Sequence, residues 1–457
     1  MNNIKDFLSA LIKKFSKSVD YLEIRVEKKE ASTISFFGPV LENIARSNNL
    51  GGSVRAMYKG GWGFVSFNDL NELDEKISLA INQAKLVGKA NLIIPSSDIK
   101  DIIVKVQIKN DPRKVSLKEK KELFEHYNNL LLSKSSKIQS TQVAYRDEIK
   151  TTYFINSFGS YVEQERLDVI GRFNVIARNE TQVKQAFESV TSRSSFDAIL
   201  NLDKKVLDTA ERALRQLEAS PVKAGSYTVI LDPKLTGVFI HEAFGHLSEG
   251  DNVYENEKMR EVLVLGKKIA VPQLKVVDSG IIPDLPGTYE YDDEGVTASR
   301  TVLIEDGILT GRLHSRETAA KMSENTTGNG RALTTSFAPI PRMTNTYIDK
   351  GDVSFNEMMS DVKEGIYAIR MLGGQTNGEL FTFSSGEAFM IRNGKIAEPV
   401  SDVTLTGNVF NTLKDIDAIG DDLTFTSGSC GKCGQNGLPV GVGGPHIRVK
   451  NVLVGGR

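Results

Sequence analysis

Residues 227–251 read YTVILDPKLTGVFIHEAFGHLSEGD, and they carry the clearest structural signals in this 457-residue chain. The apolar run at 227–231 is typical of a short strand. Asp232 and Pro233 then mark a helix start, because aspartate caps free N–H groups and proline fits the first turn. The sequence therefore predicts a strand followed by a helix over residues 233–247.

The predicted helix carries His241, Glu242 and His246, although the whole chain has only five histidines. Neutral imidazoles are preferred zinc ligands, and a carboxylate beside them accepts a proton from metal-bound water. The five-residue spacing separates the two rings by roughly 140° on a regular α-helix, whereas a π-type turn reduces the angle to about 50°. A shared metal ion therefore predicts a distorted helix, which Gly245 makes less costly. Without a metal, His241 would be a hydrogen-bonded core residue and His246 would interact with the helix dipole.

Both cysteines of the chain, Cys430 and Cys433, lie in SGSCGKCGQ at residues 427–435. A Cys-x-x-Cys pair can be a redox pair, half of a four-cysteine zinc site or two inert thiols. The sequence has no second pair, so a four-cysteine site within one chain is excluded. A redox pair usually begins a helix, whereas these cysteines have glycine neighbours in a strand-rich region. Two imidazoles and one thiolate would leave a fourth zinc position open, as in catalytic sites.

Composition excludes several function classes. Lys and Arg total 57 against 58 Asp and Glu, so the net charge of -1 provides no signal for nucleic acid or anionic lipid. No stretch approaches the roughly 20 apolar residues that span a bilayer, and lysines interrupt the apolar start of the chain. Two cysteines cannot form a disulfide framework in a chain of this length. We therefore expect a soluble, cytoplasmic protein without nucleic-acid or membrane partners.

The chain length and a change of pattern predict two domains of the α+β class. Residues 1–220 mix helical and strand periodicities. Residues 221–457 are strand-rich, which predicts a largely antiparallel domain that carries the metal site. The boundary lies in the linker-like segment at 219–225, ASPVKAG. Nine of the 39 glycines fall at 428–456, which indicates tight turns or close backbone approach.

Local patterns predict the elements of the N-terminal half. Apolar residues at helical spacing predict helices at 8–15, 70–84, 116–132 and 204–218. Alternation at 21–27 predicts a half-buried strand, with Glu23, Arg25 and Glu27 on the face opposite the apolar residues. Two strand-like runs around a Lys-Gly-Gly turn predict a hairpin at 53–67.

Four segments carry a resemblance to a known family. They are HEAFGHLSEGD at 241–251, GSCGKCGQ at 428–435, GLPVGVG at 437–443 and RMTNT at 342–346. The chain resembles the TldD/PmbA peptidases, once described as modulators of DNA gyrase, along nearly its full length. It looks like the TldD branch, which has the His-Glu-x-x-x-His motif that the PmbA (TldE) branch lacks.

The resemblance implies a zinc metallopeptidase with His241, His246 and Cys430 as metal ligands and Glu242 as the general base. It also implies that the substrate is an unfolded or extended peptide, and that a PmbA/TldE-like subunit or a second copy of the chain is a partner. Two other hypotheses stay open. One is a non-catalytic adaptor with a structural metal, and the other is a dithiol redox protein that uses Cys430 and Cys433.

Other candidate residues are weaker. The acidic run at 292–294 could hold a cation or a peptide amino terminus, or it could be a solvated loop. The segment GGQTNG at 373–378 has the glycines of a phosphate-binding loop without its Gly-Lys-Ser/Thr ending, so we expect no nucleotide. His314 and His446 could polarise a carbonyl or be ordinary histidines, whereas His126 is expected to be unrelated.

Overall fold

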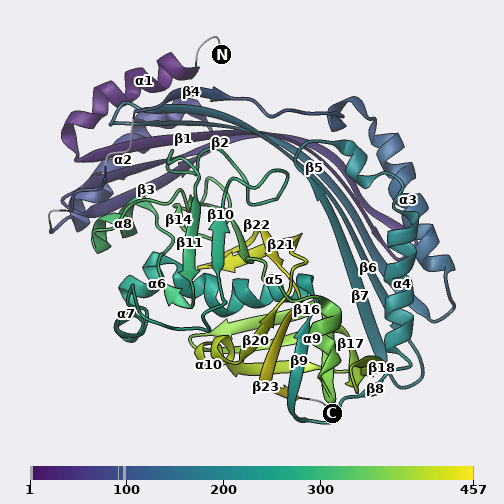
Figure 1. Cartoon of the computed structure of the whole chain (residues 1–457). Coiled ribbons are helices and arrows are strands. Elements are labelled where there is room, and N and C mark those ends of the chain that lie inside the picture. Colours follow the sequence, from purple (N-terminus) through teal and green to yellow (C-terminus); the bar gives the residue numbers. More distant parts are fainter. Residues whose placement is uncertain (1–3, 91, 96–98, 456–457) are drawn as a thin grey trace.

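The computed structural model describes residues 4–90, 92–95 and 99–455 (Figure 1). These residues form the predicted mixed α+β fold, in which a long curved sheet from the N-terminal half arches over the C-terminal half. None of the helices formed by the described residues is long and apolar enough to cross a membrane.

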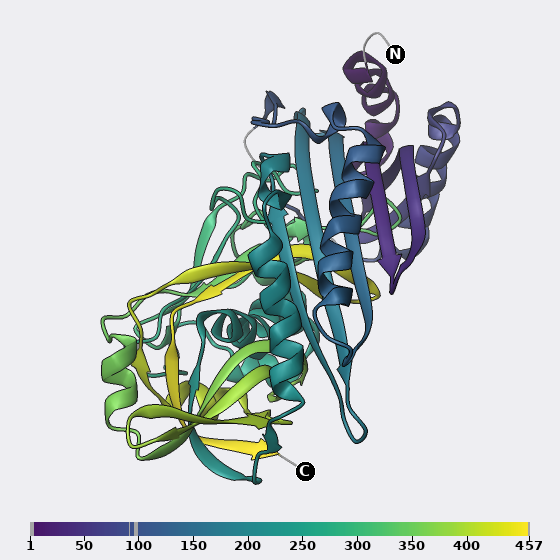
Figure 2. The ribbon, with the colours of Figure 1, turned by 90° about the vertical axis from the view of Figure 1, so that its right-hand side faces the viewer.

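The curved sheet has the strand order β3-β2-β1-β5-β6-β4, and β7 pairs with β6. Its strands are β1 (Tyr21–Phe37), β2 (Val40–Tyr58), β3 (Gly61–Phe67), β4 (Asp101–Val104), β5 (Ile138–Asn156), β6 (Tyr161–Arg178) and β7 (Val183–Ser192). Its helices are α1 (Ile4–Phe15), α2 (Leu73–Val87), α3 (Leu117–Ser133) and α4 (Asp203–Gln216). One hydrophobic cluster joins α1 and α2 to the sheet, and another joins α3 and α4, which Figure 2 shows in front of the strands.

The predicted helices and hairpin of this half are confirmed. The Ser116 hydroxyl accepts a hydrogen bond from the Glu119 N–H at 3.2 Å, and the Glu119 carboxylate accepts one from the Ser116 N–H at 2.9 Å. This capping box satisfies free donors at the start of α3. Lys59 and Gly60 join β2 to β3 with φ values of 45° and 73°, and such a two-residue turn matches the twist of paired strands.

The prediction of a half-buried strand at 21–27 is wrong in one respect. Glu23, Arg25 and Glu27 are only 3%, 2% and 2% exposed, so both faces of this part of β1 are buried. Glu27 lies 2.7 Å from the Lys29 ammonium and 3.6 Å from that of Lys150. An alternating pattern identifies the polar face of a strand. It does not show whether that face contacts water or other charged residues of the protein.

Acidification is expected to destabilise the protein through Glu27. Burial raises the pKa of this carboxyl, but Lys150, Arg25 and Lys29 outweigh burial and hold it at about 2, against 4.5 in the unfolded chain. As the pH falls from 4.5 towards 2, the unfolded state therefore binds more protons and stability is lost. The contribution is about 3 kcal/mol, measurable by urea unfolding at neutral pH and at pH ~3. Glu27→Gln should flatten this pH dependence, and an equally steep profile in the variant would contradict the assignment.

Two sheets form the C-terminal half. The larger contains β8 (Ser220–Pro221), β9 (Gly225–Leu231), β16 (Glu364–Asn377), β17 (Leu380–Arg392), β18 (Lys395–Ser401), β19 (Thr404–Asn408), β20 (Ile416–Ile419) and β23 (Ile447–Gly455). The other contains β10 (Val276–Ser279), β11 (Arg300–Glu305), β12 (Ile308–Leu309), β15 (Asn345–Ile348), β21 (Thr424–Lys432) and β22 (Gln435–Gly444). Most of their pairs are antiparallel, while β9–β16, β15–β22 and β8–β18 are parallel.

Short helices and one small ladder complete this half. They are α5 (Pro233–Ile240), α6 (Gly250–Glu255), α7 (Glu257–Val262), α8 (Arg316–Met322), α9 (Phe355–Ser360) and α10 (Val409–Lys414), with β13 (Gly330–Arg331) pairing β14 (Ile340–Pro341). One large hydrophobic cluster packs both sheets around α5, so α5 lies within the core of this half (Figure 1). The predicted linker at 219–225 contributes β8, while the division into two domains at residue 220 stays a prediction.

Candidate metal centre

The helix α5 begins as predicted from the sequence. The Asp232 carboxylate accepts hydrogen bonds from the Leu235 N–H at 2.8 Å and from the Arg370 N–H at 2.9 Å. Gly237 allows α5 to pack closely on β22, because a Cβ at this position would lie 2.6 Å from the backbone nitrogen of Gly443. The cap and the close packing fix the direction in which the helix enters the core.

The predicted helix distortion is confirmed. Residues His241–Gly245 form a π turn, and residues His246–Ser248 continue as a 3-10 turn. Gly245 has a helical φ of -53° and ψ of -51°, so its role is not to provide unusual backbone freedom. Instead, a Cβ on Gly245 would lie 2.1 Å from the sulfur of Met343. Glycine is needed here because the turn packs directly against that side chain.

The structure brings His241, His246 and Cys430 together. One potential ligand atom from each residue lies within 4.8 Å of the others. The two imidazole centroids are 5.3 Å apart, and the Cys430 sulfur is 3.5 Å from Nε2 of His246. Cys430 reaches this place from β21, next to a bulge that follows it in the pairing with β22.

The electrostatics of the cluster favour an ionised thiol. Burial raises the pKa of Cys430, but interactions with His241 and His246 outweigh burial and hold this pKa well below its usual range. Burial lowers the pKa of His246, whereas the charge of Glu249 raises it well above its ordinary value. A thiolate is the form in which cysteine binds metal.

His241 provides a test of whether a cation fits. Both of its ring nitrogens are buried without a hydrogen-bond partner among the described residues, and an unpaired buried nitrogen is costly. A bound cation would satisfy one of them. Two imidazoles and a thiolate are zinc-type donors, and these three residues would hold the ion. The donor set therefore fits a zinc ion.

Two residues beside the cluster were missed by the sequence analysis. Glu249 is fully buried, and its Oε2 lies 3.0 Å from Nδ1 of His246 and 3.0 Å from the ammonium of Lys432. Lys432 also lies 2.6 Å from the carboxylate of Asp251. Glu249 lies beyond the predicted helix end at residue 247 and follows the 3-10 turn with an extended backbone, so helical spacing gave no signal for it. Lys432 had no local signal either.

A cavity of about 570 Å³ opens beside the cluster and is lined by His241 and Glu242. Most of the rest of its lining comes from β5, β6 and β7 of the curved sheet, from the helices α4 and α5, and from β16, β17, β21 and β22. Its size is that of a typical ligand site. Glu242 therefore faces a space that can admit a substrate.

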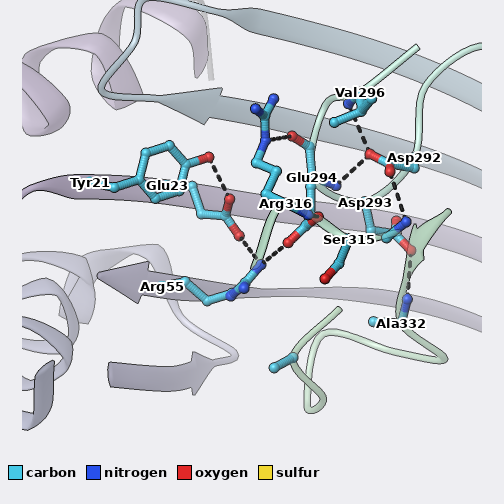
Figure 3. Close-up of polar contacts among 12 residues, drawn as sticks. Tyr21, Glu23, Arg55, Asp292, Asp293, Glu294, Val296, Ser315, Arg316 and Ala332 are labelled. Carbon is cyan, nitrogen blue, oxygen red and sulfur yellow. Dashed lines mark hydrogen bonds and ion pairs between the residues drawn. The ribbon is translucent and has the colours of Figure 1, made fainter. Parts of the chain in front are cut away.

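The acidic run at 292–294 is buried, so the prediction of a solvated loop is wrong. In Figure 3 it meets β1 and β2, where Arg55 donates to Glu294 at 2.6 Å and to Glu23 at 3.0 Å. Arg25 lies 3.2 Å from Asp293 in the same interface. Guanidinium groups of the curved sheet thus occupy the place that the other alternative gave to an external cation or a peptide amino terminus.

The other candidate residues have structural roles. His314 is buried and lies 3.0 Å from Glu324, whereas His446 lies 2.6 Å from Asp422. The segment at 373–378 forms the end of the β16–β17 hairpin, so it is not a phosphate-binding loop. The remaining histidine, His126, pairs with Asp203 on the surface. None of these described residues lines the cavity beside His241.

Sequence models of one family match most of the chain. The PmbA/TldA metallopeptidase domain 1 matches residues 22–85, the central domain matches 110–220 and the C-terminal domain matches 224–456. A metalloprotease of Synechocystis sp. is 45% identical over 455 residues, which cover 99% of this chain and 98% of that protein. A zinc metalloprotease TldD homolog of Saccharolobus solfataricus is 30% identical over 442 residues, covering 95% of this chain and 96% of that protein.

Solved structures share the fold. TldE from Thermococcus kodakarensis aligns with a TM-score of 0.77 at 18% identity and covers 98% of this chain and 99% of its own. A Thermotoga maritima protein described as a candidate modulator of a DNA gyrase aligns with a TM-score of 0.79 at 19% identity and covers 99% of this chain and 100% of its own. The sequence matches over nearly the full length confirm the resemblance, and the chain belongs to the PmbA/TldD metallopeptidase family.

Proposed function

We propose that this chain is a zinc-dependent peptidase in which His241, His246 and Cys430 bind the ion and Glu242 is the general base. The observation that carries the proposal is the meeting of two imidazoles and a thiol at a π turn, beside a cavity that His241 and Glu242 line. The description of the Saccharolobus solfataricus relative as a zinc metalloprotease supports the choice of metal.

The roles follow from position and charge. Bound zinc would lower the pKa of a coordinated water to about 7 and polarise the peptide carbonyl. Glu242 is the carboxylate next to the ligand His241 on the cavity wall, so it is placed to take a proton from the attacking water and pass it to the leaving amine. Glu249 fixes the ring of His246 through Nδ1, which leaves Nε2 facing Cys430.

The substrate is an unfolded or extended peptide. β21 is the last strand of its sheet, and Ser427, Gly428 and Ser429 of this strand line the cavity. An extended peptide could pair its backbone with such an edge, which tolerates many side chains because every residue offers an N–H and a C=O. A folded domain would resist cleavage, because its backbone groups are already paired.

The partner is a PmbA/TldE-like subunit or a second copy of this chain. The likeness in fold to TldE supports this assignment. A cytoplasmic location suits the proposed site, because a reducing compartment keeps Cys430 available as a thiolate ligand.

Removal of the metal tests the proposed function. Zinc-free protein is expected to lose cleavage of a disordered peptide, and stoichiometric zinc should restore it, because the ion supplies the Lewis acid. Peptide fragments are measured by chromatography, with a stably folded domain as the control substrate. Cleavage that persists after metal removal would contradict the proposal. If cleavage needs an added PmbA/TldE-like subunit, the experiment is run on that complex.

Glu249→Gln is expected to weaken zinc binding about 10- to 100-fold, because the amide holds the His246 ring without a charge. The affinity is measured by competition with a chromophoric chelator, so the readout does not depend on activity. Glu261→Gln on the exposed surface of α7 is the matched control and should bind zinc as the unmodified protein does. Unchanged affinity in Glu249→Gln would show that this carboxylate does not position the ligand.

A further inference from the structure

A second charged cluster lies in the wall of the same cavity. Its centre is Glu188 on β7, which is buried and accepts hydrogen bonds from Lys234 at 3.2 Å and Arg212 at 3.4 Å. Arg370 of β16 also donates to this carboxylate. All four residues line the cavity, and they come from four different elements, β7, α4, α5 and β16.

Basic side chains outnumber acidic ones along the cavity, where five Arg and Lys residues and three Asp and Glu residues form part of the lining: Arg172, Arg193, Arg212, Lys234 and Arg370 against Asp168, Glu188 and Glu242. Asp208 is the second acid of the cluster around Glu188, at 3.1 Å from Arg212 and 4.0 Å from Arg370. Asp232 is a third acid beside Arg370, whose N–H donates to its carboxylate, while the adjacent Arg215–Glu387 pair is neutral by itself. Lys234 and Arg370 keep 34% and 25% of their side chains exposed, so solvent or a ligand can reach their donors. The exposed Arg172 of β6, the strand next to β7, also lines the cavity and adds a further positive charge.

The backbone holds Arg370 in an unusual conformation. Its φ is 58°, in the left-handed region that residues other than glycine rarely adopt. The hydrogen bond from its N–H to the Asp232 cap stabilises this conformation. Strain of this kind is often found where a side chain must point in one direction for function.

The position of Lys234 on α5 sets the spacing between this cluster and the candidate metal centre. Lys234 precedes His241 by seven residues, or two helical turns, on the face of α5 that lines the cavity. This spacing corresponds to about 10 Å along the helix axis. An extended peptide rises about 3.3 Å per residue, so roughly three residues span the distance.

We propose that Lys234 and Arg370 form a carboxylate-binding subsite for the peptide substrate. The inference deepens the proposed function, because it assigns an acidic recognition group to the peptide that reaches Glu242. The excess of basic side chains along the cavity and the exposed donors of Lys234 and Arg370 favour an anion, and a carboxylate is the anion that a peptide offers. It comes either from the C-terminus of the peptide or from an Asp or Glu side chain. A bound C-terminus would place the cleaved bond about three residues from the end.

Binding is tested without relying on cleavage. Glu242→Gln protein is titrated with three fluorescent versions of one disordered peptide of Gly, Ser and Thr. The first has a free C-terminal carboxylate, the second is its C-terminal amide, and the third is the amide with one internal Asp. At least one carboxylate peptide is expected to bind roughly tenfold more tightly than the neutral amide. Tighter binding of the first peptide identifies the terminus as the source, and tighter binding of the third identifies the side chain.

Variants then connect this preference to the subsite. Adding Lys234→Met to Glu242→Gln should remove the preference, whereas Lys234→Arg should retain it. Arg370→Gln provides a second removal of charge if Lys234→Met does not fold. Lys395→Met, at an exposed lysine on β18 away from the cavity, is the matched control.

Equal affinity for all three peptides would overturn the subsite, and so would loss of the preference in Lys395→Met. Because these are binding measurements, a carboxylate preference without any zinc-dependent cleavage would refute the proposed function alone. Zinc-dependent cleavage with no carboxylate preference would refute the subsite alone.

Discussion

Glu242→Gln is expected to lower kcat for peptide cleavage by about 10²- to 10⁴-fold, the usual contribution of a general base. The amide keeps the shape of the side chain but cannot accept the proton of the attacking water. Zinc binding should change little, because Glu242 is not among the three clustered donors. The measurement pairs steady-state cleavage of a disordered peptide with metal analysis of the same sample.

The matched control for this prediction is again Glu261→Gln, which makes the same chemical change on the surface of α7. This variant should cleave as the unmodified protein does. A Glu242→Gln enzyme that retains near-normal kcat with bound zinc would remove Glu242 from the chemistry. That outcome would favour another base, whereas loss of zinc from the variant would show that its carboxylate helps to hold the ion. If the unmodified protein binds zinc but never cleaves a peptide, alone or with its partner subunit, the adaptor hypothesis gains support.

The π turn shows how a chemical constraint can predict local structure. Propensity alone favours a continuous helix to about residue 247, because nothing in the apolar pattern marks a break. The requirement that His241 and His246 share one ion adds an angular condition that a regular helix does not meet. The structure has the π turn at this place. The sequence could not show why residue 245 must be glycine. Met343, whose side chain leaves no room for a Cβ there, lies about a hundred positions away in the chain, and only the fold brings it near.

Buried charge was the main feature that sequence reasoning could not place. The alternating pattern predicts that Glu23 and Glu27 face solvent, because the pattern of a single strand shows which residues are polar but not what they contact. In the folded chain, Glu23 meets Arg55 of the next strand, and Arg55 also meets Glu294 from the C-terminal half (Figure 3). Glu188 is a similar case, since its cations come from three other elements. Such pairings depend on the whole topology and have no local signal.

Cys430→Ala is expected to remove tight zinc binding and to reduce peptide cleavage about 100-fold or more, because only two protein ligands would remain where catalytic zinc sites have three. Cys430 is almost fully buried, so the variant is checked for folding by circular dichroism before its zinc content is measured. Loss of zinc with an intact fold would assign the thiol to the metal. Normal zinc content in the variant would contradict the proposed ligand set.

Cys433→Ala is the matched control for that experiment, and it also tests the dithiol hypothesis. Cys433 is exposed at the β21–β22 turn with a φ of 49°, and both cysteines are free thiols in the structure. A metallopeptidase that uses only Cys430 should keep its zinc and its activity in Cys433→Ala. A dithiol oxidoreductase should lose activity equally in both variants, because each sulfur is needed to form the disulfide. The two variants therefore separate the hypotheses. If Cys430 binds zinc, only Cys430→Ala loses activity, and if the protein uses dithiol chemistry, both variants lose it.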